Sequence, residues 1–184
     1  MIEGKEHVLT GRSRFLAFRI ESGWVEIRRM SLLRCGHSKA REGGAIRVSG
    51  DGHVLLKKLT VVECQAKCGA VYVKKDGHLK VMNCIFLSCT ASINGGAIYN
   101  NGMCQLIKST FSSCKAEGRG GAVFNNDGGS CEAKACEFRN CKGEKEGGGF
   151  YNSSQALVLL SDNNYEGNRT SSLSGKAASF CQGL

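Results

Sequence analysis

The chain has 184 residues, 41% of them hydrophobic, which is enough for one domain with a buried core. Its 25 lysine and arginine residues exceed its 16 acidic residues, so the formal charge of +9 excludes a strongly acidic surface and favours anionic partners. No apolar run approaches the ~20 residues of a membrane-spanning helix, and the first residues lack an apolar signal-peptide core, so we expect neither feature in this chain.

A motif of about 26 residues repeats along most of the chain, and this repeat decides the expected architecture. We expect a partial first coil over residues 1–24, six repeats over 25–179 and a short tail over 180–184, with no recognisable cap at either end. Alignment of the repeats on their first cysteine gives the column Cys35, Cys64, Cys89, Cys114 and Cys141. Three residues earlier stands an aromatic column that consists of Phe86, Phe111, Phe138 and Tyr165.

Within each repeat, apolar or small residues stand two or three positions apart in three short groups. In one repeat these groups are Val54 with Leu56, Leu59 with Val61, and Val71 after the glycine column. Period-two alternation indicates strands with one buried face, and no window shows the i, i+3, i+4, i+7 pattern of a helix. The repeat therefore predicts an all-β parallel solenoid of about six coils, with three short strands per coil.

Equivalent residues of successive coils are expected to lie one strand spacing apart, at ~4.8 Å. The aromatic column should therefore form a stack of rings inside the rod. The glycine pairs that precede the third group, such as Gly120 and Gly121, fit a tight corner, because glycine allows positive φ and close approach of stacked backbones.

Two short motifs resemble the repeats of the polymorphic membrane protein family. The segments "GGAI" (43–46 and 95–98) and "GGAV" (120–123) resemble the first half of its signature. "FLSCTA" (86–91) and "FSSCKA" (111–116) resemble the second half, F-x-x-N-x-A, with cysteine in the asparagine position. The resemblance covers about residues 25–179. It implies a right-handed parallel β-helix of the pectin-lyase-like group, exposed at the cell surface or outside the cell, and a role in adhesion.

The 11 cysteines allow two interpretations: a disulfide or metal scaffold, or small buried hydrophobic residues. Stacked cysteines would have parallel Cβ vectors, which leaves their Cβ atoms farther apart than the ~3.8 Å that a disulfide prefers. The pair in "CQAKC" (64–68) has no second pair or histidine set nearby, so we expect no zinc site and no cofactor. We favour buried free thiols, with Cys181 as the exposed one.

Catalysis on a polysaccharide would require clustered carboxylates. Asp51, Asp76 and Asp127 fall in predicted turns, and we expect no strand face to collect two carboxylates from adjacent coils. We therefore predict no catalytic residues. A polysaccharide lyase or hydrolase is the alternative that such a cluster would favour.

Several surface features suggest binding. A basic patch is expected where Arg28, Arg29, Lys57 and Lys58 fall in matching columns, and it could hold an acidic polysaccharide or simply be a solvated face. His53 and His78 should stack on neighbouring coils, as a small metal or proton site or as aligned turn residues. An outer aromatic column could be a sugar-binding stripe or a packed corner, and its members are Tyr72, Tyr99, Phe124 and Tyr151. The platforms typical of single-strand nucleic-acid binders are missing, so we expect no specific nucleic acid.

The sequence thus predicts one β-helix domain over residues 1–184 with a non-catalytic role. With the family resemblance taken into account, we expect that role to be adhesion, ligand binding or structural display by a surface-exposed or secreted module, with an acidic polysaccharide or a cell-surface ligand as partner. A polysaccharide-active enzyme and a fragment of a larger surface protein are the alternatives. Two glycosylation sequons occur, at Asn152 and Asn168, and the second falls in the inward cysteine column.

Overall fold

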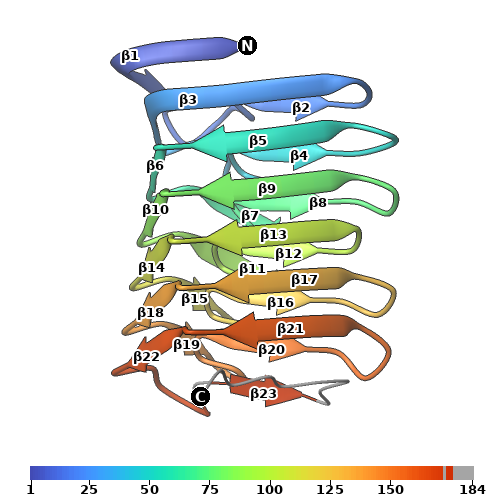
Figure 1. The fold of residues 1–184 in the computed structure, drawn as a ribbon. Helices are drawn as coiled ribbons and strands as arrows, with labels where there is room; N and C mark the ends of the chain where they lie inside the picture. The colour runs from blue at the N-terminus through green and yellow to red at the C-terminus, as the bar shows by residue number, and fades with distance from the viewer. Residues whose placement is uncertain (172, 176–184) are drawn as a thin grey trace.

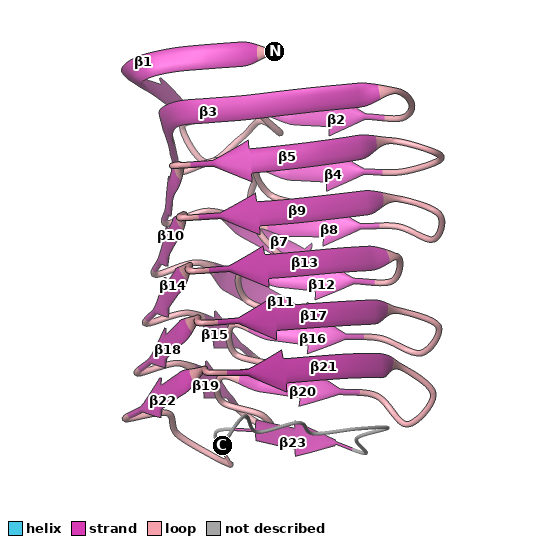
Figure 2. Ribbon diagram, in the orientation of Figure 1, coloured by secondary structure: helices cyan, strands magenta, loops and turns pink. Residues whose placement is uncertain are grey.

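A computed structural model describes residues 1–171 and 173–175 of the chain. Over these residues the protein is a right-handed parallel β-helix of about seven turns and contains no helix (Figures 1 and 2). The predicted fold class is therefore confirmed. Successive coils stack along one axis, and the amino terminus lies at one end of the rod (Figure 1).

The largest sheet has 12 strands and bends around a corner of the rod into two faces. Its front face contains the first half of β3 (Trp24–Leu33) and the strands β5 (His53–Lys57), β9 (His78–Met82), β13 (Met103–Ile107), β17 (Ser130–Lys134) and β21 (Leu157–Ser161). Its side face contains the second half of β3 and the strands β6 (Thr60–Val62), β10 (Ile85–Leu87), β14 (Thr110–Ser112), β18 (Glu137–Arg139) and β22 (Asn164–Glu166). Strand β1 (Ile2–Thr10) pairs with β3 along both faces.

Two further sheets complete the rod, one of them in the central coils only. The smaller one contains β7 (Gln65–Cys68), β11 (Thr90–Asn94), β15 (Lys115–Ala116) and β19 (Lys142–Gly143). The other contains β2 (Phe18–Ile20), β4 (Ile46–Val48), β8 (Val71–Val73), β12 (Ile98–Asn100), β16 (Val123–Asn125), β20 (Phe150–Asn152) and β23 (Leu173–Gly175). The three predicted groups correspond to the front face, the side face and this last sheet. The smaller sheet adds a fourth short strand to the central coils, which the sequence analysis did not predict.

The bend between the front and side faces is made by one residue per coil with a left-handed backbone. Arg29, Lys58 and Asn83 have φ values of 53°, 54° and 52° at this corner. In β1 the same bend falls at Lys5 and Glu6, with φ values of 45° and 69°. The left-handed residue is an extra position at the corner and interrupts the alternation of inward and outward side chains. The alternation then starts again on the next face with an inward residue.

The core consists of ladders of equivalent inward side chains. Phe86, Phe111, Phe138 and Tyr165 form one stack, with 5.0 Å between successive ring centroids and planes within 11° of parallel. The cysteine column lies beside it, and all five of its members are fully buried: Cys35, Cys64, Cys89, Cys114 and Cys141. Asn168 continues this column, accepts a hydrogen bond from the Cys141 N–H (2.8 Å) and donates one to the Phe138 carbonyl (2.9 Å).

A second polar ladder, which the sequence analysis missed, fixes the turns between β12, β16 and β20 and the following strands. Asn100, Asn125 and Asn152 are fully buried, and the amide of each of the first two donates to the next side-chain oxygen at 2.7 Å. The Asn125 amide also donates to the Leu157 carbonyl at 2.8 Å. Burial of Asn152 in the folded protein closes its sequon to a glycosylating enzyme.

The ten described cysteines are free thiols, and nine of them are buried. Burial raises the pKa of Cys84 and of Cys136 to about 11, which removes the reactive thiolate at neutral pH. Cys68 is the partly buried exception. Cys181, the thiol expected to be exposed, lies outside the described residues.

We expect a thiol reagent at pH 7 to leave Cys89, Cys114 and Cys141 unmodified in the native protein. In a Cys181→Ser variant, a single fast phase should come from Cys68 and should disappear in the double variant with Cys68→Ser. Mass spectrometry of peptides after timed labelling checks this result. Rapid modification of these three thiols without denaturant would contradict the inward direction of the cysteine column.

Candidate functional site

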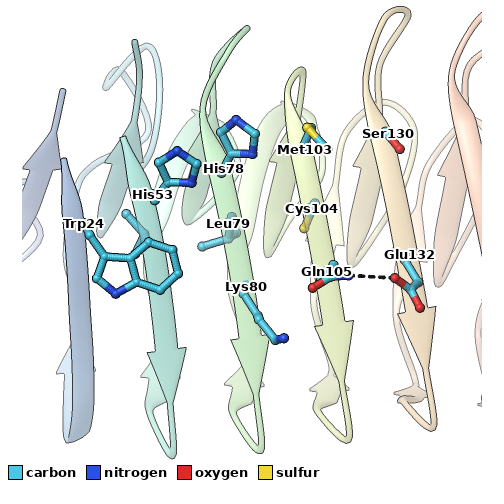
Figure 3. A pocket seen from close by; sticks show the side chains of 11 residues that line it. Trp24, His53, His78, Leu79, Lys80, Met103, Cys104, Gln105, Ser130 and Glu132 are labelled. Atoms are coloured by element: carbon cyan, nitrogen blue, oxygen red, sulfur yellow. Dashed lines mark hydrogen bonds between the residues drawn. The ribbon is translucent and has the colours of Figure 1, made fainter. Parts of the chain in front are cut away.

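The front face carries an open groove of about 440 Å³ on its outer surface, across β3, β5, β9, β13 and β17 (Figure 3). Outward side chains of neighbouring strands form rows here, because their register places equivalent residues side by side. One row runs Trp24, His53, His78, Met103 and Ser130. The next row contains Lys80, Gln105 and Glu132. The groove is therefore apolar and aromatic along one row and polar along the other.

The aromatic end of the groove is exposed and stacked. Trp24 is 70% exposed, and its ring centroid lies 5.7 Å from that of His53, with planes 25° apart. The rings of His53 and His78 lie 4.2 Å apart with planes within 16°. The structure thus brings the two predicted histidines together and adds Trp24, which the sequence analysis missed. The sequence alignment could have identified Trp24, since it stands one coil earlier in the column that contains His53 and His78.

The polar row offers both a cation and hydrogen-bonding groups. The Gln105 side-chain amide donates to the Glu132 carboxylate at 2.8 Å, which orients both groups at the edge of the groove (Figure 3). Lys80 stands beside Gln105 on the neighbouring strand. Such a row can bind hydroxyl groups through Gln105 and Glu132 and a carboxylate through Lys80.

Strand β1 partly neutralises the predicted basic patch. Arg28 pairs with Glu3 at 3.1 Å, and Arg29 pairs with the same carboxylate at 3.6 Å. Lys57 and Lys58 have no ion pair within the part of the chain that the structure describes. Lys57 lies on the front face, four residues after His53 on β5, so its charge is added to that of Lys80 near the groove.

The outer aromatic column on β8, β12, β16 and β20 is packed rather than open. Its rings stack with centroids 5.0 to 5.2 Å apart, and its members are Tyr72, Tyr99, Phe124 and Tyr151. Tyr72 and Phe124 are buried, and the Arg119 guanidinium covers the Tyr151 ring at 5.2 Å. Burial also raises the pKa of the Tyr72 hydroxyl. These contacts favour the packed-corner interpretation over a sugar-binding stripe.

Carboxylates of adjacent coils do come together, which corrects the expectation that no strand face collects them. On the side face, Glu137 and Glu166 share Arg139, at 3.2 and 3.7 Å. After β15 and β19, Glu117 and Glu144 line a groove of about 250 Å³. Both pairs lie outside the inward columns, so an alignment of buried positions did not reveal them.

A metal-binding cluster and a membrane-spanning helix are both missing from the described residues. No group of three histidine, cysteine, aspartate or glutamate side chains there is arranged to hold a metal ion. Over the same residues, no helix has the length and apolar character needed to cross a membrane. In comparisons with known proteins, neither a family model, nor a curated protein, nor a solved structure matches this chain.

Proposed function

We propose that the protein is a non-catalytic binding module that holds an extended acidic polysaccharide on its front face, as part of a surface-exposed or secreted assembly. The single observation that carries this proposal is the groove headed by the exposed Trp24 ring. A large exposed aromatic side chain adds nothing to the core, and its apolar face fits the apolar face of a sugar ring.

The rest of the groove supports the same ligand class. The stacked His53 ring extends the flat surface beyond Trp24 by one coil. Gln105 and Glu132 supply acceptors and a donor for hydroxyl groups, and Lys80 supplies positive charge for carboxylates. Lys57 lies beyond the groove lining on β5 and adds positive charge to the same face. A polymer that lies along the rod axis would meet the aromatic rings of Trp24 and His53 first and the polar groups of Gln105 and Glu132 on later coils.

The proposal is tested through the intrinsic fluorescence of Trp24, the only tryptophan in the chain. Titration with polygalacturonate oligomers should change this fluorescence saturably, and added salt should weaken binding. Replacement of Lys57 and Lys80 by glutamine should weaken binding by roughly tenfold, because two charge-assisted contacts are lost. Lys145→Gln, an exposed change on a distant turn, should leave binding unchanged.

Dextran, a neutral polysaccharide, is the matched ligand control in this titration. Equal binding of dextran and polygalacturonate would reject the acidic ligand class. The lack of any change in fluorescence or any retention on immobilised polysaccharide would reject the groove as a saccharide site and favour structural display.

The carboxylate pair Glu117 and Glu144 favours polysaccharide cleavage as a second candidate function. Glu144 is held in an ion pair with Lys142 at 2.6 Å, whereas no ion pair holds Glu117 within the described coils. Incubation with the same polysaccharides should therefore be followed by reducing-end release and by the ultraviolet absorbance of unsaturated products. Product formation that is lost in both Glu117→Gln and Glu144→Gln would make the enzyme the better account.

A further inference from the structure

Strand β1 leaves the apolar core open at the amino-terminal end of the rod. In the register of β1 with β3, Ile2 lies over Ile27 and Leu9 lies over Leu32. The two residues on β3 are fully buried, whereas Ile2 and Leu9 are 38% and 39% exposed. Among the described residues, these two inward columns of the core therefore end in side chains that no other strand covers.

The backbone of β1 is open at the same edge. Outward residues donate their N–H groups to the preceding coil: Ile85 to the Leu59 carbonyl at 2.8 Å, and Thr110 to the Cys84 carbonyl at 2.9 Å. Val8 stands in the same column through its pairing with Ser31. Its N–H and C=O groups therefore point away from β3, and among the described strands β1 pairs with β3 alone. An open parallel edge of this kind is a template for another strand.

We propose that a second copy of this chain docks head to head on β1, about a two-fold axis that passes between Lys5 and Glu6. These two residues form the corner of β1, so the axis bisects the corner and exchanges the front and side faces. Residues 2–4 of one copy then lie antiparallel on residues 7–9 of the other. This interface is separate from the groove and does not depend on its ligand.

In the register that this axis imposes, the two copies of β1 match in both their side chains and their backbone groups. Ile2 faces Leu9 of the second copy, and both are inward residues that extend the core. Glu3 faces Val8 of the second copy, and both are outward residues whose backbone groups point to the shared edge. In an antiparallel pair of strands, non-hydrogen-bonded residue pairs alternate with hydrogen-bonded ones. Ile2 with Leu9 is a pair of the first kind and Glu3 with Val8 is a pair of the second kind, so the proposed register has this alternation.

Charge selects this register over its neighbours. The axis places Lys5 opposite Glu6 of the second copy, and symmetry repeats the pair, so two ion pairs form at the corner. A shift by one residue in either direction would bring two copies of Lys5 or two copies of Glu6 onto the axis. It would also move an inward residue opposite an outward one. The self-complementary arrangement identifies a second copy as the occupant and predicts a closed dimer.

Exchange of the two charges at the corner tests the proposal in the 184-residue chain. Sedimentation equilibrium of the wild-type protein should show a monomer–dimer equilibrium without larger species. Lys5→Glu and Glu6→Lys should each raise the dimer dissociation constant by roughly tenfold, because both symmetric pairs become repulsive. The double variant should restore dimerisation. A mixture of the two single variants should form a heterodimer, because their corners are again opposite in charge.

Circular dichroism of each variant verifies that the β-helix is intact. Both positions are exposed residues at the corner of β1, and Glu6 also pairs with Arg29 of the same chain at 4.0 Å. A protein that stays monomeric up to millimolar concentration would overturn the proposal. So would single variants that dimerise as tightly as the wild type, or growth beyond the dimer, which would indicate head-to-tail stacking. Failure of the two single variants to associate when mixed would reject the two-fold register even if a dimer exists.

Discussion

Replacement of Phe111 by alanine should lower the free energy of unfolding by about 3–5 kcal/mol. Phe111 lies in the middle of the aromatic stack, 5.0 Å from the ring of Phe86 on one side and 5.0 Å from that of Phe138 on the other. It is fully buried, and the rigid strands around it cannot collapse into the space that the ring would leave. Urea denaturation followed by circular dichroism would measure the loss.

Phe15→Ala provides a matched control for this substitution. Phe15 is 67% exposed, so the same chemical change there should alter stability by only about 0.5 kcal/mol. Phe111→Leu, which keeps most of the buried volume, should cost much less than Phe111→Ala. A loss at Phe111 no larger than that at Phe15 would show that the stack does not stabilise the rod.

Replacement of Asn125 by alanine should destabilise the fold by about 2–4 kcal/mol, because several buried hydrogen bonds are lost together. Asn125 accepts from the Asn100 amide and donates to the Asn152 side chain and to the Leu157 carbonyl, all within 2.8 Å. The same denaturation experiment applies. Asn126→Ala is the control, since the partly buried Asn126 amide only donates to Asn101 at 3.2 Å and should contribute less than about 1 kcal/mol.

An Asn125→Asp variant separates hydrogen bonding from packing at the same position. A carboxylate keeps the shape of the amide but cannot donate, so it would be destabilising at neutral pH. Burial should raise its folded-state pKa above the value of ~3.9 in the unfolded chain. The variant should therefore be most stable below that value and lose stability as the pH rises. Stability that does not change with pH would show that donation by Asn125 is dispensable.

The fold could be predicted because the inward columns are large and repeated. Phe86, Phe111 and Phe138 alternate with polar neighbours at a nearly constant spacing, and each copy strengthens the pattern. Strand β7 and its equivalents were missed because their inward residues are small, for example Ala66 and Ala91, and give little contrast with their neighbours. The asparagine ladder was missed because buried polar residues look like turn residues in a sequence.

The candidate site was less predictable because it depends on residues that occur once. Trp24 and Lys80 differ in residue type from their column neighbours, so the alignment gives their positions but no repeated residue draws attention to them. The charge of the basic patch was overestimated for a similar reason. Glu3 precedes the aligned repeats, and the register of β1 shifts between Glu3 and His7, so its pairing with Arg28 could not be read from a column.

Coil-to-coil pairing makes the length of this rod adjustable by whole periods. Ile85 pairs with Thr110 and Phe86 pairs with Phe111, so loss of residues 86–110 would join Ile85 to Phe111 and return every inward column to phase. The rod would shorten by one strand spacing, ~4.8 Å, with its cross-section unchanged. Genetic duplication or loss of a coil can therefore tune how far the module reaches, in fixed increments, while each new junction repeats one that already exists.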